Sequence, residues 1–342
     1  MKKIFSIIFA LIFVANTFGA KQLTAVNLIV MRTTGMHALV LGYDDGTLEL
    51  RNWKGDKIAS RKFTSKITAM KVDHGQGTAL PRIFVASSES SGTIRVIDPA
   101  DLATDLAKKT GTGTVQCFNV RQNWLYAGTS GGTLWKLDNK TLAQQAKRTG
   151  FGSIKYVSDS GNPPDAYSNI FITSTNSGGS IYRLKYDTLA TLGSKSSIGT
   201  ITGFTCNDWV DADYFDIYLV ISAESGTLKK LNGQTFATEA SKTSVGNVNF
   251  MCAGYPGLDP DSEPTLVICD TTGTLRTWKW NGTAFLKVKY QTSLGSIVEA
   301  AVDDLYQTDA YQIVYFCNKS GKVMWYIRDE AMKLYNYAII AP

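Results

Sequence analysis

A pattern that recurs along the whole chain is clearest in Leu125-Tyr-Ala-Gly-Thr-Ser-Gly-Gly-Thr-Leu-Trp-Lys-Leu137. An apolar run is followed by a small polar turn that ends in glycine, and then by a segment in which apolar and polar residues alternate. Alternation with a period of two predicts a β-strand, so the stretch predicts a strand, a tight turn and a second strand. The same pattern recurs with anchoring glycines 40 to 48 residues apart: Gly46, Gly92, Gly132, Gly179, Gly226, Gly273 and Gly321.

A second signature recurs in the same register between these units. It is a Ser/Thr-rich tetrapeptide ending in glycine, followed by an apolar residue two positions later. Its copies are Thr110-Gly-Thr-Gly113, Thr149-Gly-Phe-Gly152, Ser196-Ser-Ile-Gly199, Thr243-Ser-Val-Gly246 and Thr292-Ser-Leu-Gly295, with a shortened form at Thr64-Ser-Lys-Ile67. Two independent signatures at one period indicate a true repeat.

Each repeat is therefore predicted to hold four strands, called a to d. Strand a follows the second signature, strand b is the apolar run, strand c follows the anchoring glycine, and strand d closes the unit. An Asp or Asn six or eight residues after each glycine should start the c–d turn, because such side chains bond to nearby backbone amides. These residues are Asn52, Asp98, Asp138, Asp187, Asn232, Asn281 and Asp329.

Four strands per 40–50 residues predict an all-β fold, a seven-bladed β-propeller of four-stranded antiparallel blades. Each blade is contiguous in sequence, with no strand exchanged where the ring closes. An array of β-sandwiches is the alternative, but a period near 47 is short for domains of about 100 residues.

The first twenty residues are predicted to be a secretory signal peptide. Residues 1–3 are short and basic, residues 4–14 are apolar, and small residues follow, with cleavage after Gly19 or Ala20. An uncleaved membrane anchor is the alternative. Residues 21–342 then form a single propeller domain, secreted or extracellular, or periplasmic in a Gram-negative host. No later run of 18 apolar residues predicts a membrane span in the mature chain. The formal net charge of +6 is mild, and no nucleic-acid partner is predicted.

Two segments resemble known propeller families. Trp124-Leu-Tyr-Ala-Gly-Thr-Ser-Gly-Gly-Thr-Leu-Trp-Lys-Leu-Asp138 resembles the blade motif of quinoprotein-type (PQQ-repeat) propellers and is similar to WD40 repeats, although no blade has the Trp-Asp ending. Cys206-Asn-Asp-Trp-Val-Asp-Ala-Asp-Tyr-Phe-Asp-Ile-Tyr-Leu-Val220 resembles a degraded FG-GAP repeat.

The quinoprotein resemblance implies pyrroloquinoline quinone, a bound calcium ion and an Asp base. The sequence has no adjacent Cys pair and no long insertion to build such a pocket, and its only histidines are His37 and His74. We therefore predict a non-enzymatic binding or structural propeller without a cofactor, with a protein or glycan as partner recognised through its loop faces. A quinoprotein-like dehydrogenase is the alternative.

The FG-GAP resemblance implies calcium in the a–b loop of the fifth repeat. The candidate ligands are four acidic side chains within nine residues: Asp208, Asp211, Asp213 and Asp216. Trp209 replaces one expected ligand and no glycine relaxes the turn. Carboxylates this close need a counter-charge, which calcium, solvent or nearby lysines could supply.

Basic residues also recur near the end of strand d in successive repeats, which predicts a basic face. The residues are Lys62, Lys109, Arg148, Lys195, Lys242 and Lys289. The alternative is that these are ordinary solvated loop charges, since acidic residues of the b–c turns such as Asp45 and Asp270 dilute this face.

The cysteines and glycosylation sequons leave two questions open. The chain has five Cys, and Cys252 and Cys269 lie on neighbouring predicted strands and could form a disulfide. The favoured interpretation is that the cysteines are small buried hydrophobic residues. Three Asn-x-Ser/Thr sequons, at Asn139, Asn281 and Asn318, fall in predicted turns and are acceptors only in a eukaryotic host. The sequence does not indicate an oligomeric state.

Overall fold

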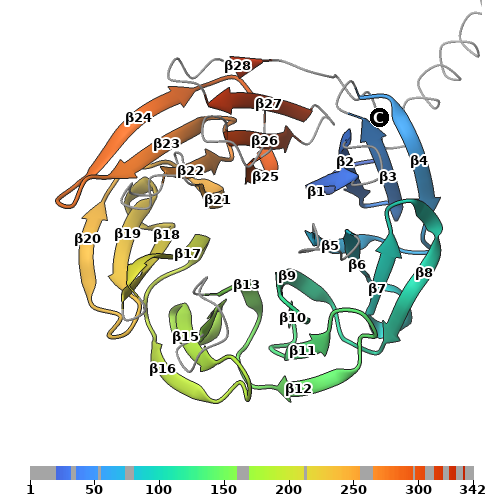
Figure 1. The fold of residues 1–342 in the computed structure, drawn as a ribbon. Coiled ribbons are helices and arrows are strands. Elements are labelled where there is room, and N and C mark those ends of the chain that lie inside the picture. Colours follow the sequence, from blue (N-terminus) through green and yellow to red (C-terminus); the bar gives the residue numbers. More distant parts are fainter. Residues whose placement is uncertain are drawn as a thin grey trace, which may run out of the picture.

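The computed structural model describes residues 21–31, 36–52, 55–73, 81–159, 169–211, 214–254, 265–295, 297–304, 312–318, 323–328 and 334–335. Within these residues the strands pair into seven four-stranded antiparallel sheets, each made of four consecutive strands. The sheets stand around a common centre, with strand a innermost and strand d outermost (Figure 1). The predicted β-propeller of four-stranded antiparallel blades is confirmed.

The blades are numbered in chain order. Blade 1 contains β1 (Leu23–Met31), β2 (Met36–Tyr43), β3 (Thr47–Asn52) and β4 (Lys57–Lys62), and blade 2 contains β5 (Ile67–Asp73), β6 (Arg82–Ser87), β7 (Thr93–Asp98) and β8 (Asp101–Thr110). Blade 3 contains β9 (Val115–Arg121), β10 (Trp124–Thr129), β11 (Leu134–Asp138) and β12 (Gln144–Arg148), and blade 4 contains β13 (Ile154–Asp159), β14 (Asn169–Ser174), β15 (Ser180–Lys185) and β16 (Thr191–Lys195). Blade 5 contains β17 (Ile201–Asp211), β18 (Tyr214–Ile221), β19 (Thr227–Asn232) and β20 (Thr238–Lys242), and blade 6 contains β21 (Val248–Gly254), β22 (Thr265–Asp270), β23 (Leu275–Trp280) and β24 (Phe285–Gln291). Blade 7 contains β25 (Ile297–Asp304), β26 (Gln312–Asn318), β27 (Val323–Arg328) and β28 (Leu334–Tyr335).

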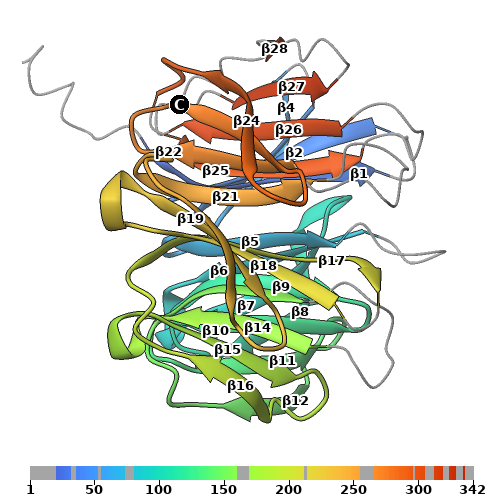
Figure 2. The ribbon, with the colours of Figure 1, turned by 90° about the vertical axis from the view of Figure 1, so that its left-hand side faces the viewer.

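The connections gather at two opposite faces of the ring, as the side view shows (Figure 2). One face carries the a–b and c–d connections, and the other carries the b–c turns and the d–a loops. Three b–c turns contain short 3-10 helices, η1 (Glu89–Ser91), η2 (Asn176–Gly178) and η3 (Ala223–Ser225). No helix among the described residues is long and apolar enough to cross a membrane.

The hydrophobic core lies between neighbouring blades. Leu48 and Leu50 of blade 1, for example, pack in one cluster with Ile67 and Val85 of blade 2. Side chains alternate across each strand, so every blade contributes one set of side chains to each neighbour. β1 contacts β25, which brings blades 1 and 7 together where the ring closes.

The two sequence signatures meet at these blade junctions. The carbonyl of each anchoring glycine accepts a hydrogen bond from the d–a loop that leads into the next blade. The bonds run from Phe63 to Gly46, Thr112 to Gly92, Phe151 to Gly132, Ile198 to Gly179, Val245 to Gly226 and Leu294 to Gly273, at N–O distances of 2.9 to 3.2 Å. Gly321 lies outside the described residues.

Close approach explains why these positions are glycine. Gly179 has a φ of +94°, and a Cβ placed on it would lie 1.9 Å from the carbonyl oxygen of Gly199. Gly226 faces Gly246 in the same way. Since only glycine tolerates both that φ and that contact, the anchoring glycine and the signature glycine are two halves of one junction.

The c–d turns confirm the predicted role of the Asx residues. The Oδ1 atom of Asn232 accepts hydrogen bonds from the backbone amides of Gln234 and Thr235. The Oδ1 atom of Asp138 likewise accepts two backbone amides of its own turn. An apolar residue then follows, which the sequence analysis did not identify. Leu142, Leu189 and Phe236 have positive φ and insert into the core shared with the preceding blade.

Candidate functional site

Most of the predicted basic series makes contacts within the propeller. Arg148 at the end of β12 donates a 2.6 Å hydrogen bond to the carbonyl of Leu189 in the next blade, and Lys195 donates one of 2.7 Å to Phe236. Arg61 makes the equivalent bond to Leu102 at 3.0 Å. In each case an outer-strand cation caps the c–d turn of the following blade.

The structure corrects the register of this series. Arg61, rather than Lys62, lies opposite the first apolar residue of strand c, as Lys109 and Arg148 do. Lys62 instead forms an ion pair with Asp45 at 2.5 Å, and Lys109 lies 5.3 Å from the centre of the Trp135 ring. Lys242 is exposed, and Lys289 lies in β24 with a side chain outside the described set.

The predicted acidic loop of blade 5 is instead mostly strand. Asp208 and Asp211 belong to β17 and Asp216 to β18, with Asp208 paired to Phe215 across the hairpin. The aromatic and β-branched residues between the acids favour pairing, which explains why the predicted long a–b loop is wrong. Asp213 lies outside the described residues.

Asp216 has a protein partner. Its carboxylate forms an ion pair with the Lys230 ammonium at 2.9 Å, and Lys230 also reaches Glu239 at 3.1 Å. Burial raises the pKa of Asp216, and the hydrogen bond from Lys230 only partly offsets this effect. In the part of the chain that the structure describes, no group of three His, Cys, Asp or Glu side chains is arranged to hold a metal ion. The calcium site is not tested by this and stays a prediction.

The predicted cysteine pair is not bonded. Among the described residues, Cys252 and Cys269 are not joined by a disulfide, and neither Cys117 nor Cys206 takes part in one. Cys252 lies opposite Val267, and Phe250 lies opposite Cys269, so the two cysteines are diagonal neighbours. Diagonal Cβ atoms are about 7–8 Å apart, beyond the roughly 4 Å of a disulfide.

The sequons occupy different environments. Asn139 is buried, and its amide nitrogen donates to the carbonyl of Gln122 at 2.6 Å, so a glycan has no room there. Asn281 is exposed in the c–d turn of blade 6, where its Oδ1 atom accepts the amides of Thr283 and Ala284. Asn318 ends β26, and its side chain is outside the described set.

The strongest candidate for an interaction site is an aromatic and charged cluster between blades 3 and 4, on the face of the a–b and c–d connections. Trp124 and Tyr186 are half-buried, and the indole nitrogen donates to the Tyr186 hydroxyl at 2.6 Å. The ammonium of Lys136 lies 4.5 Å from the centre of each of these two rings. It also donates to the carbonyl of Asp187 at 3.3 Å.

A second layer of polar side chains supports this cluster. Arg121 at the end of β9 forms an ion pair with Asp159 at the end of β13, at 3.4 Å, and stacks over Tyr186. Asn119 donates to the other Asp159 oxygen at 2.8 Å. Burial lowers the pKa of Lys136, opposed by the charge of Asp187. The buried cations hold the two aromatic rings in fixed positions at the surface, which is an arrangement suited to recognition rather than to acid–base chemistry.

The sequence alone does not predict this cluster, because Trp124 reads as part of the repeated blade motif and Tyr186 belongs to no motif. The sequence does contain a signal for this cluster. Trp124 begins strand b of blade 3, Tyr186 directly follows strand c of blade 4, and Lys136 interrupts the apolar strand c of blade 3. The contact joins residues 62 positions apart, so only the ring geometry reveals it.

Comparison with known proteins supports the fold. No family model matches the chain, and no curated protein matches it. Among solved structures, BBS1N in complex with ARL6DN has a TM-score of 0.69 and 14% identity, over 89% of this chain and 91% of that one. The WD40 propeller domain of Doa1 has a TM-score of 0.59 and 12% identity, over 92% and 95% of the two chains. A chain in the mitotic checkpoint complex has a TM-score of 0.63 and 10% identity, over 91% and 89%.

Identities this low carry the architecture and not the partner. The strand order, the repeated junctions and these likenesses lead to one conclusion: the chain is a β-propeller whose fold is similar to that of WD40 and BBS1 propellers.

Proposed function

We propose that the protein is an exported, non-enzymatic binding propeller that takes a protein partner on the cluster between blades 3 and 4. The observation that carries the proposal is the pair of half-buried aromatic rings, Trp124 and Tyr186, held by the buried cation Lys136. Aromatic residues fixed in this way are the usual anchors of protein interfaces. A propeller supplies a rigid base for such a site.

Site-specific photo-crosslinking tests the location of the interface. A photoreactive residue at exposed Asn123, beside Trp124, is compared with one at exposed Thr243 on the opposite face. In the medium of the native host, we expect a discrete adduct at position 123 and none at position 243. Adducts at 243 alone, or at neither position, would reject this face. A glycan array probed with the same protein distinguishes a carbohydrate partner, which would bind without any adduct to protein.

Export is tested separately, by fusing residues 1–20 to a reporter and sequencing the N-terminus of the product. We expect release into the medium or periplasm with cleavage after Gly19 or Ala20. In a eukaryotic secretory host, the secreted protein should carry a glycan at Asn281 and none at Asn139, because the latter side chain is buried. A reporter retained in the cytosol would reject export.

Two cofactor questions have direct tests. Quinone and calcium added to the purified protein should give no bound-quinone absorption, whereas a stable quinone complex would favour the dehydrogenase alternative. Calcium binding at Asp208, Asp211 and Asp213 is kept as a proposal on their spacing, with Asp216 already paired to Lys230. Calorimetric titration of metal-stripped protein decides it, since absence of heat at millimolar calcium would reject the site.

A further inference from the structure

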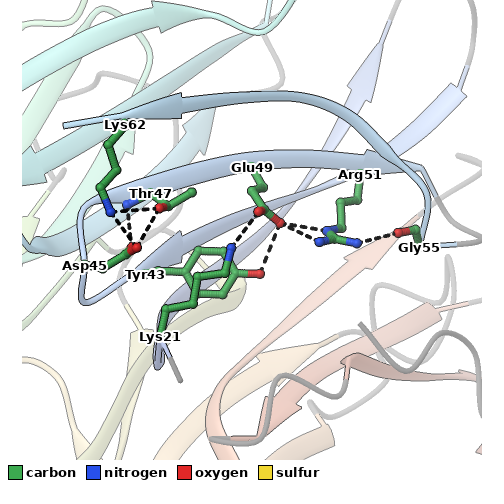
Figure 3. A network of polar contacts seen from close by, with 8 residues as sticks. All are labelled: Lys21, Tyr43, Asp45, Thr47, Glu49, Arg51, Gly55 and Lys62. Atoms are coloured by element: carbon green, nitrogen blue, oxygen red, sulfur yellow. Dashed lines mark hydrogen bonds and ion pairs between the residues drawn. The ribbon is translucent and has the colours of Figure 1, made fainter. Parts of the chain in front are cut away.

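The first two described residues, Lys21 and Gln22, are bound to blade 1, and Figure 3 shows Lys21 beside Tyr43 and Glu49. The Lys21 ammonium forms an ion pair with Glu49 at 2.7 Å and lies 4.1 Å from the centre of the Tyr43 ring. The backbone of Gln22 exchanges two bonds with Asp44: its amide donates to the carboxylate at 2.7 Å, and its carbonyl accepts the Asp44 amide at 2.9 Å.

The second of these bonds occurs at every described blade entrance. The residue that directly follows strand b donates its amide to the carbonyl of the residue that precedes strand a. The equivalent bonds run from Ser88 to Lys66, Ser130 to Thr114, Thr175 to Ser153, Ser222 to Thr200 and Thr271 to Asn247. Lys21 and Gln22 therefore occupy, in blade 1, the position of the d–a loop that joins one blade to the next.

The partner of Lys21 is a buried carboxylate. Glu49 lies between Leu48 and Leu50, which face blade 2, so its side chain faces the opposite side of blade 1, where blade 7 stands. Only 5% of the Glu49 side chain is exposed. Arg51 forms an ion pair with it at 2.7 Å, and the Tyr43 hydroxyl donates to it at 3.3 Å. Loss of Lys21 would remove one of two cations from a carboxylate that water hardly reaches.

We infer that Lys21 and Gln22, here called the N-terminal latch, do for blade 1 what the end of a d–a loop does for the other blades, so that N-terminal processing must stop before Lys21. The inference rests on the proposed export. Cleavage after Gly19 or Ala20 leaves the latch intact, whereas removal of two further residues takes away both the Glu49 cation and the blade-entrance bond. A product trimmed beyond Ala20 would be less stable, and this loss of stability limits how far the N-terminus can be processed.

Point variants of the full chain test the latch. Lys21→Ala should lower the melting temperature of the purified protein by about 3–6 °C, because a buried carboxylate loses a partner in a protein of this size. Lys21→Arg should restore most of this loss. Lys66→Ala is the matched control, because Lys66 is exposed at the equivalent blade entrance and contributes its backbone carbonyl; it should melt like the parent. In a Glu49→Gln background, Lys21→Ala should cost less than half as much.

Amide hydrogen exchange separates the latch from a general loss of stability. In Lys21→Ala the Asp44 amide should exchange at least about tenfold faster while the Ser88 amide is unchanged. An unchanged melting temperature, or equal effects at Asp44 and Ser88, would overturn the inference. Mass spectrometry of each product identifies its N-terminus. If residues 1–20 are retained and Lys21→Ala still lowers the melting temperature, the export proposal is rejected and the latch is supported. If the protein is exported and Lys21→Ala melts like the parent, only the latch is rejected.

Discussion

The junction of blades 3 and 4 and the junction of blades 1 and 2 make the same backbone bond by different means. At the first, Gly132 accepts the Phe151 amide at 3.2 Å, and a Cβ on Gly132 would lie 2.6 Å from the backbone nitrogen of Gly152. At the second, Gly46 accepts the Phe63 amide at 2.9 Å, but the following loop has no glycine.

Charged side chains add to this backbone contact at the junction of blades 1 and 2. The guanidinium groups of Arg61 and Arg95 lie 4.8 and 4.9 Å from the centre of the Phe63 ring. Arg95 forms ion pairs with Glu89 and Asp105, and Arg61 with Asp105 at 2.7 Å. A Cβ on Gly46 would also lie 2.5 Å from the carbonyl oxygen of Ser65, so the backbones pack closely here as well. The shortened signature therefore keeps the close backbone packing and adds a buried ionic network to it.

The largest effect is expected where backbone meets backbone. Gly132→Ala should destabilise the protein by about 3 kcal/mol or more, because the new Cβ meets the Gly152 backbone at a φ of +76°. Gly131→Ala is the matched control in the same turn, since a Cβ on Gly131 meets nothing within 4 Å. Chemical denaturation of both variants gives the two values. Equal losses would mean that the junction contact does not matter.

A slightly smaller loss is expected at the side-chain junction. Arg95→Ala should cost about 2–3 kcal/mol, because it takes the buried cation from Glu89 and leaves Asp105 with Arg61 alone. Arg95→Lys keeps the charge but not the planar stacking on Phe63, so it should fall between Arg95→Ala and the parent. A neutral Arg95→Ala variant would show that Phe63 alone fills this junction.

The junction of blades 5 and 6 combines both means and should respond to acid. Burial alone would raise the pKa of Asp270, but hydrogen bonds from Thr272 and Arg276 outweigh burial and lower it. A carboxyl with a lowered pKa stabilises the fold at neutral pH, and this contribution is lost as the pH falls below its ordinary value of 3.8. Asp270→Asn should cost about 1–2 kcal/mol at pH 7 and show a shallower loss of stability towards pH 3. Melting curves across this pH range check it, and parallel curves for parent and variant would contradict it.

The smallest effect is a gain. The second position has a positive φ in all five full copies of the signature, as in Gly111, Gly150 and Ser244, where φ is +69°, +92° and +59°. Ser244→Gly should relieve the cost of a left-handed serine and stabilise the fold by about 0.5 kcal/mol, since added freedom of the unfolded chain offsets part of the gain. Gly111→Ala should do the reverse. Chemical denaturation of each variant beside the parent measures both changes in the free energy of unfolding. A loss of stability in Ser244→Gly would show that the serine side chain matters more than its backbone conformation.

The sequence predicted the repeat, the strand order and both glycine signatures, because each is a local pattern with a fixed period. It did not predict that the two signatures bond to each other, nor that Leu189 and Phe236 enter the core of the preceding blade. The regular recurrence of basic residues can be seen in the sequence. Their role in capping turns cannot, because it depends on contacts between residues 41 positions apart, such as Arg148 and Leu189. The blade 5 acids were misplaced because charge suggested a loop, while the neighbouring aromatic residues favoured paired strands.

The central claim is that the d–a loops are hydrogen-bonded to the preceding blade through the anchoring glycines. Amide hydrogen exchange of the intact protein tests it at the donors Phe151, Ile198 and Val245, which lie between strands. We expect protection comparable to that of strand b amides, and selective loss of protection at Phe151 in Gly132→Ala. Exchange at all three donors as fast as in a free loop would contradict it.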